Sequence, residues 1–257
     1  MTRARTITGA LLLTGLLTVG GCANEEEHEP ARHAAHWGYE GAEGPSHWGD
    51  LNPEWILCKT GRNQSPIDLS GLIEGELPPL HINYRPDATE ILNNGHTVQV
   101  NYRPGSTLTV DGHDFTLRQF HFHAPSENTI DGRAFPMEAH LVHADAQGNL
   151  AVVAVMFEEG AANPALTLAF SHMPEKAGDK HAFSAETVNA ADLLPADRDY
   201  YRYNGSLTTP PCSEGVWWLV MKQPMTASKA QIEHFRHVMH HPNNRPVQPI
   251  NARPVLK

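Results

Sequence analysis

The chain has 257 residues, of which 40% are hydrophobic, and this is enough for one well-packed core or at most two small ones. Its apolar and aromatic content excludes a disordered chain. The formal net charge of -10 argues against nucleic-acid binding, which needs a basic face. Composition and charge therefore favour a soluble enzyme with a small or neutral substrate.

The N-terminal segment has the pattern of an export signal. Arg3 and Arg5 precede a mostly apolar run over residues 7–19, which is too short to span a bilayer comfortably. A sequence resembling a bacterial lipobox follows and reads Val19-Gly20-Gly21-Cys22. We expect a signal peptide over residues 1–21, with Cys22 as a candidate lipid anchor to the membrane; the alternative is a plain cleaved signal peptide. Either form places the protein in the periplasm or another extracytoplasmic space.

The rest of the chain divides into a tether and one domain. Residues 22–36 are rich in charged side chains and predict a mobile tether, whereas residues 37–257 contain no linker or repeat. If Cys22 carries a lipid, Cys58 and Cys212 remain as an even pair. Export implies an oxidising compartment, which favours a disulfide between them; two buried free thiols are the alternative.

Short segments with the alternation of β-strands dominate this domain. In chain order, we expect strands at residues 81–84, 97–102, 107–110, 117–123, 137–143, 150–157 and 215–221. Asp111-Gly112 predicts a hairpin turn after the third of them. Helices are expected only at residues 163–172 and 228–239, the second capped by Ser228. The pattern predicts a β-dominated domain with short peripheral helices.

Two of these strands carry a candidate metal site. Because strand side chains alternate between faces, Gln119, His121 and His123 share one face of the first strand, and Glu138 and His140 share one face of the next. Antiparallel pairing would bring His140 beside the other two histidines. Three neutral imidazoles suit zinc and leave a fourth position open for water, as in catalytic sites.

The neighbouring polar residues strengthen this interpretation. Gln119 and Glu138 each lie two residues from a histidine on the same face, where they can accept its second ring N–H. A buried Glu138 would be costly on a strand with only a structural role. The alternative is that the three histidines are ordinary core or surface residues. The combined pattern favours one zinc ion per chain.

An ordered series of motifs is similar to those of the α-class carbonic anhydrases, of the bacterial exported type. The resemblance extends over residues 37–249, nearly the whole mature chain. Its motifs are His36-Trp37-Gly38-Tyr39, Gln64-Ser65-Pro66-Ile67-Asp68, Asn94-Gly95-His96, Gln119-Phe120-His121-Phe122-His123, Ser126-Glu127-Asn128, Glu138-Ala139-His140-Leu141-Val142-His143 and Ser206-Leu207-Thr208-Thr209-Pro210-Pro211.

The resemblance implies a role for each matching residue. Zinc-bound hydroxide would attack carbon dioxide and give bicarbonate, and Thr208 would orient the hydroxide by donating its own proton to an ionised Glu127. His96 would be the proton shuttle. The zinc ligands would be His121, His123 and His140, and the acceptors of their ring N–H groups would be Gln119 and Glu138. Tyr39 and Asn94 would order the waters of the proton path. The substrate pocket would be lined by Val142, Val152, Leu207, Thr209 and Trp218.

The resemblance also implies a fold and an assembly. The fold would be a single α/β domain built on a large, twisted, mostly antiparallel central sheet. The Cys58 and Cys212 pair falls where such enzymes have a disulfide, and bacterial relatives often form homodimers. Two rival hypotheses remain: a non-catalytic binding protein of the same fold, and a periplasmic zinc-storage protein. The 17 histidines suggest the second, which would bind several zinc ions.

Overall fold

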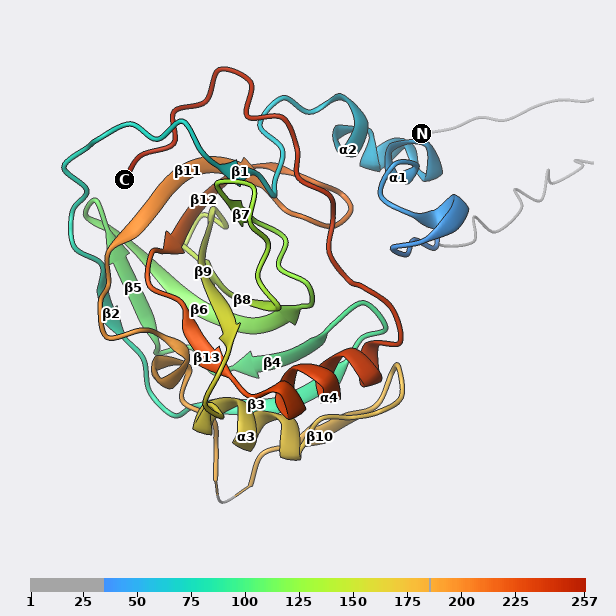
Figure 1. Ribbon diagram of the computed structural model, residues 1–257, viewed down its shortest axis with the longest axis vertical. Coiled ribbons are helices and arrows are strands. Elements are labelled where there is room, and N and C mark those ends of the chain that lie inside the picture. The colour runs from blue at the N-terminus through green and yellow to red at the C-terminus, as the bar shows by residue number, and fades with distance from the viewer. Residues whose placement is uncertain (1–34, 185) are drawn as a thin grey trace, which may run out of the picture. The chain divides into compact units, whose positions relative to one another are not determined.

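The computed structural model describes residues 35–184 and 186–257 (Figure 1). The predicted signal peptide, Cys22 and the tether up to residue 34 lie outside the described residues. In the part of the chain that is described, no helix has the length and apolar character needed to cross a membrane.

The described residues form a β-dominated domain with few and short helices, as expected from the sequence. The α-helices are α1 (Trp48–Leu51), α2 (Leu57–Thr60), α3 (Pro164–Ser171) and α4 (Lys229–Met239), and the 3-10 helices are η1 (Gly41–Glu43), η2 (Pro53–Trp55) and η3 (Ala190–Leu193). The strands are β1 (Asp68–Leu69), β2 (His81–Asn83), β3 (Ala88–Asn93), β4 (Val98–Tyr102), β5 (Thr107–Val110), β6 (His113–His123), β7 (Thr129–Ile130), β8 (Met137–Ala144), β9 (Leu150–Glu159), β10 (Lys180–Ala182), β11 (Tyr200–Ser206), β12 (Glu214–Met221) and β13 (Met225–Ala227).

One large sheet forms the centre of the domain (Figure 1). Its main path has the order β10, β3, β4, β6, β8, β9, β12 and β11, while β2 and β5 join it through β6, and β13 pairs with β9. Within the described residues, this sheet is antiparallel except where β12 and β13 run parallel to β9. The predicted single domain with a large, mostly antiparallel sheet is therefore confirmed.

The strand that carries two of the histidines is longer than predicted. β6 begins at His113 instead of residue 117, because its first part pairs with β5 across the predicted hairpin turn. Asp111 and Gly112 have φ angles of 51° and 74°, the left-handed conformation that a two-residue hairpin turn requires. Glycine adopts it without strain, and aspartate tolerates it better than most residues.

Alternation along β6 separates the two faces of the sheet. Phe120 and Phe122 are fully buried and point to the side that α3 and α4 cover. The Phe122 ring lies 5.2 Å from Phe170 of α3 and 6.0 Å from Phe235 of α4, measured between ring centroids. Burying such rings stabilises the domain by roughly 2–3 kcal/mol each. It also fixes the histidines of β6 on the opposite face.

The predicted disulfide joins two distant parts of the domain. Cys58 of α2 is bonded to Cys212, 154 residues later in the chain. Both cysteines are buried against Trp48 of α1, with Trp37 and Tyr39 packed beside them. The disulfide therefore ties the N-terminal helices to the loop that follows β11.

Candidate metal centre

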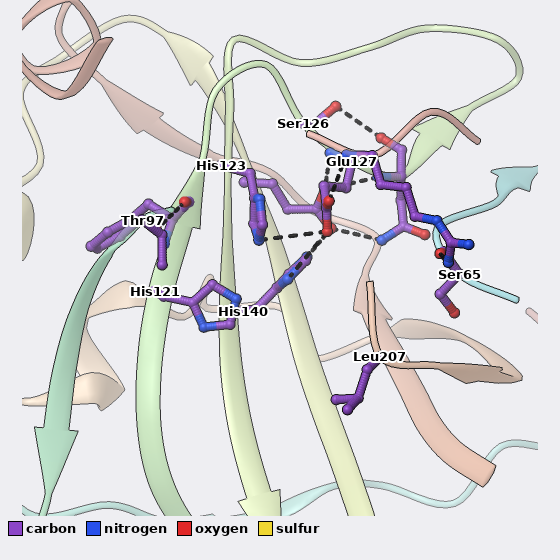
Figure 2. Close-up of polar contacts among 12 residues, drawn as sticks. Ser65, Thr97, His121, His123, Ser126, Glu127, His140 and Leu207 are labelled. Atoms are coloured by element: carbon purple, nitrogen blue, oxygen red, sulfur yellow. Dashed lines mark hydrogen bonds and ion pairs between the residues drawn. The ribbon is translucent and has the colours of Figure 1, made fainter. Parts of the chain in front are cut away.

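Three imidazoles meet where β6 and β8 lie side by side in the middle of the sheet. The antiparallel register places His121 directly opposite His140, and His123 two residues further along β6. The ring centroids are separated by 5.1 Å for His121 and His123, 5.3 Å for His121 and His140, and 4.6 Å for His123 and His140. One nitrogen from each ring lies within 4.8 Å of the others, so the three can hold one metal ion (Figure 2).

The other nitrogen of two rings is held by a neighbour on the same strand face. His121 Nδ1 donates to Gln119 Oε1 at 2.8 Å, and His140 Nε2 donates to Glu138 Oε1 at 2.9 Å. These bonds fix the tautomers, so the lone pair of His121 is on Nε2 and that of His140 is on Nδ1. Both lone pairs are on the nitrogens that face the shared centre.

The third ring is held by a residue that the sequence analysis did not identify. His123 Nδ1 donates to the backbone carbonyl of Asn243 at 2.6 Å. The Asn243 side chain accepts from the N–H of Ala124 and donates to the carbonyls of His96 and Phe122. This one asparagine therefore anchors a candidate ligand, the end of β6 and the loop of the predicted proton shuttle.

The donor set fits a metal ion that prefers imidazole. His123 Nε2 is buried and has no hydrogen-bond partner, a cost that a bound ion would remove. Burial lowers the pKa of His121 and His140 well below 6.5 and also lowers that of His123, so all three rings are neutral at pH 7. Neutral imidazole is the form that coordinates zinc and similar transition metals.

Glu138 is completely buried, yet its carboxylate is fully hydrogen-bonded. Besides His140, it accepts from the backbone N–H of Glu127 at 2.7 Å, and from the backbone and side-chain N–H of Asn128 at 2.9 and 2.8 Å. Burial raises the pKa of Glu138, and these hydrogen bonds oppose the increase. The desolvation cost is thus offset by four donors.

Glu127 lies beside His123 and His140 (Figure 2). Its Oε1 accepts from the backbone N–H of Arg245 at 2.8 Å, and its Oε2 lies 3.5 Å from His123 Nε2 and 3.9 Å from His140 Nδ1. Burial raises the pKa of Glu127 to about 8, and the Arg245 N–H and the nearby Thr208 side chain oppose this increase. The structure thus places Thr208 beside Glu127, as the resemblance implies.

A small cavity of about 140 Å³ opens onto the histidines. A volume well below the ~300 Å³ of a typical ligand pocket suits a very small substrate. Seven of its ten lining residues were expected at the site from the sequence, whereas Trp37, Thr97 and Gln99 were not. The seven are Tyr39, Asn94, His96, Gln119, His121, His123 and Thr209.

The predicted apolar pocket residues come from neighbouring strands. Val142 of β8 pairs with Val152 of β9, which pairs in turn with Trp218 of β12. Together with Leu207 they belong to one apolar cluster. The Trp218 ring lies edge-on to His140 with a centroid separation of 4.9 Å. The sheet therefore places an apolar wall beside the imidazoles.

Comparisons with known proteins point to one family. A family model of eukaryotic-type carbonic anhydrases matches residues 43–257. Carbonic anhydrase of Pectobacterium carotovorum is 51% identical over 226 residues, which are 88% of this chain and 92% of the relative. The structure of α-carbonic anhydrase from Thermovibrio ammonificans with the inhibitor sulfanilamide has a TM-score of 0.85 and 51% identity, and covers 88% of this chain and 100% of that one. A hyperthermostable carbonic anhydrase from a hydrothermal vent chimney has a TM-score of 0.84 and 55% identity, over 86% of this chain and 99% of that one.

Proposed function

The chain belongs to the eukaryotic-type, or α-class, carbonic anhydrase family of lyases, and we propose that it catalyses reversible hydration of carbon dioxide to bicarbonate and a proton. We propose further that His121, His123 and His140 hold one zinc ion per chain. The observation that carries this proposal is the convergence of three neutral imidazoles whose outer nitrogens are each fixed by an acceptor.

Zinc in such a site lowers the pKa of a bound water from 15.7 to about 7. The chain's own residues would do the rest. Gln119, Glu138 and the Asn243 carbonyl fix the tautomer and orientation of the three rings by the bonds described above, while burial keeps the rings neutral. In other zinc sites, loss of such a partner weakens metal binding by about 10–100-fold.

Thr208 and Glu127 would orient the attacking nucleophile. A threonine hydroxyl has one proton, and if it donates this proton to Glu127, its oxygen lone pairs are available to accept from the nucleophile. Glu127 must be ionised to accept that bond. Burial opposes ionisation and raises its pKa to about 8, whereas the Arg245 N–H, the Thr208 hydroxyl and a cation held by the three imidazoles would favour the ionised form. The nucleophile's own lone pair is then directed at the substrate carbon.

Carbon dioxide would lie against the apolar wall, and the proton would leave on the opposite, polar side. The wall consists of Val142, Val152, Leu207 and Trp218, with Thr209 bordering the cavity beside it. On the polar side, His96 would accept the proton at a ring nitrogen, while Tyr39 and Asn94 order the water between them. An apolar wall beside the imidazoles and a polar cavity lined by His96 would thus separate substrate binding from proton transfer.

Export to the periplasm or a similar compartment is a further part of this proposal. The Cys58–Cys212 disulfide supports it, because such bonds persist in oxidising compartments. We propose residues 1–21 as the signal peptide, 22–36 as the tether and 37–257 as the enzyme domain. We also propose that a lipid on Cys22 attaches the protein to the membrane, which mass spectrometry can test. A homodimer is a further part of the proposal, which sedimentation can test.

The decisive experiment combines metal analysis with a stopped-flow hydration assay. The parent protein should contain one zinc ion per chain, hydrate carbon dioxide and be inhibited by a sulfonamide. The variant His140→Ala should lose zinc and activity together, whereas His237→Gln on the exposed side of α4 should keep both.

Other results would favour the rival hypotheses. Several zinc ions per chain would support metal storage, and one zinc ion without hydration would support a non-catalytic binding protein. Full activity of His140→Ala with one bound zinc would contradict the ligand assignment.

A further inference from the structure

The mouth of the metal cavity carries more than one imidazole. His96 lies with its ring centroid 6.4 Å from that of His36. His241 also lies near His96, with its ring centroid 5.9 Å from that of Tyr39. The resemblance assigns a role in proton transfer to His96 but none to His241. His241 follows α4, at a position that the sequence motifs did not single out.

His241 lines one cavity and lies beside a residue that lines another. Tyr39, beside it, lines the inner cavity together with His121 and His123. His241 itself lines a separate outer cavity of about 390 Å³, formed with Ala124, Pro125, Arg236, His240 and Pro242. A base in this position can exchange protons with water on the inner side and with dissolved buffer on the outer side.

The ring of His241 presents a suitable nitrogen and is firmly placed. Its Nδ1 lies 3.0 Å from the carbonyl of Pro242 and donates to it in the neutral form, so Nε2 is the basic nitrogen. Asn243, two residues later, bonds through its carbonyl to His123 and through its side chain to the His96 carbonyl. The backbone around His241 is therefore tied to both the metal centre and the shuttle loop.

His96, in contrast, is restrained. Its ring is stacked flat on Trp37, with a centroid separation of 3.7 Å and an interplanar angle of 7°. The half-buried ring of His96 lines the inner cavity while it is held in this stack, and the stack limits its freedom to turn toward the outer solvent. A second base that serves the same cavity would carry protons while His96 remains stacked.

We infer that His241 is a second proton acceptor for the metal cavity. Water in the inner cavity beside Tyr39 loses a proton to Nε2 of His241: the O–H bond breaks, an N–H bond forms, and no electrons are transferred. The proton then passes from the imidazolium to a buffer base in the outer cavity, which restores the neutral ring. This inference rests on the proposed hydration reaction.

The charges around His241 suit a ring that alternates with His96. Among the described residues, the titratable or charged side chains near it are Tyr39, His96, His240 and Arg236. Burial lowers the pKa of His96 most, and the like charges of His36 and His241 lower it further. A proton on His241 therefore disfavours a proton on His96.

Kinetics of the zinc-loaded enzyme in weak buffer would test the inference. We expect kcat of H96Q/H241Q to fall by about 10²-fold, the lower end of the range for general acid–base groups, and kcat of each single variant by about tenfold or less. The ratio kcat/KM should stay unchanged and added imidazole should restore kcat, because only proton export is affected. H237Q, which removes an exposed imidazole from α4, is the matched control and should behave like the parent. A double variant no slower than H96Q would overturn the inference.

A second readout does not depend on activity. Histidine ring protons followed by NMR in the zinc-loaded protein should show a higher pKa for His96 in H241Q than in the parent, and no change in H237Q. An unchanged pKa of His96 would refute the coupling between the two rings. If the parent fails to hydrate carbon dioxide, the proposed function is wrong. If the parent is active and H241Q changes neither kcat in weak buffer nor the pKa of His96, only the role of His241 as a second proton acceptor is wrong.

Discussion

At the scale of single residues, His143 is a buried imidazole on the face of the sheet opposite the candidate metal centre. His143 lies three residues after His140 on β8 and, as predicted, points away from the metal centre. Its Nδ1 donates to the Ala151 carbonyl at 3.2 Å, and its Nε2 accepts from the Tyr84 hydroxyl at 2.6 Å. Burial lowers the pKa of His143 from 6.5 to about 4, so the ring is neutral in the folded protein.

This burial predicts a contribution to acid sensitivity. Because the unfolded chain binds a proton at His143 below pH 6.5 and the folded chain does so only near pH 4, folding loses stability as the pH falls through this window. With about 1.36 kcal/mol per pKa unit, the loss is on the order of 3 kcal/mol. His143→Gln should be less stable at pH 7 but should show a shallower decline toward pH 4 in urea titrations. Parallel stability curves for parent and variant would contradict this prediction.

Local spacing made part of the metal centre predictable. His121 with Gln119 and His140 with Glu138 are pairs two residues apart on one strand face, so the period of a β-strand brings each pair together. The support of His123 is different, because it comes from a backbone carbonyl 120 residues away in sequence. Every residue has a backbone carbonyl, so the sequence alone cannot indicate which carbonyl accepts a hydrogen bond from His123.

At the scale of elements, α3 and α4 stabilise each other through their first turns. Ser228 accepts from the backbone N–H of Gln231, and the Gln231 side chain accepts from that of Ser228, which completes a capping box. The same Gln231 side chain accepts from the N–H of Asn163, the N-cap of α3, and donates to the Asn163 carbonyl. One side chain thus connects the starts of the two helices that cover the phenylalanine face of β6.

Loss of this cap should be measurable. Ser228→Ala removes an acceptor for an orphan N–H of α4 and should lower the free energy of unfolding by about 1 kcal/mol. Ser171→Ala is the matched control, because the exposed Ser171 hydroxyl bonds to the Leu168 carbonyl of its own helix and to the adjacent His172 Nδ1, and does not cap a helix N-terminus. Chemical denaturation of both variants beside the parent would check this. Equal losses in the two variants would show that the cap itself contributes nothing.

Elements were predictable where a local pattern defines them. The apolar runs of β9 and β12, the turn at Asp111-Gly112 and the Ser228 cap of α4 mark their elements in sequence. The helices α1 and α2 have only four residues each and show no amphipathic period that could reveal them. The order of the strands, including the parallel pairing of β9 with β12, depends on contacts between distant residues and has no local signal.

At the scale of the whole molecule, the disulfide restrains the chain over most of the domain. Cys58 and Cys212 close a loop with a sequence separation of 154 residues. Chain-entropy arguments give about 5 kcal/mol of stabilisation for a loop of this length, as an upper figure. The double variant Cys58→Ser/Cys212→Ser should therefore unfold at clearly lower denaturant concentration than the oxidised parent. A parent whose midpoint is the same with and without a reducing agent would contradict this prediction.

The position of the candidate ligands in the sheet has a consequence for how a metal ion would leave. β6 and β8 are the two middle strands of the eight on the main path, and both are flanked by further strands. Fraying at an edge such as β10 or β11 leaves them paired, so no small opening of the domain separates His121 or His123 from His140. An ion that leaves through the cavity therefore leaves its three ligands in place, and rebinding to this preformed site would compete with capture by a chelator.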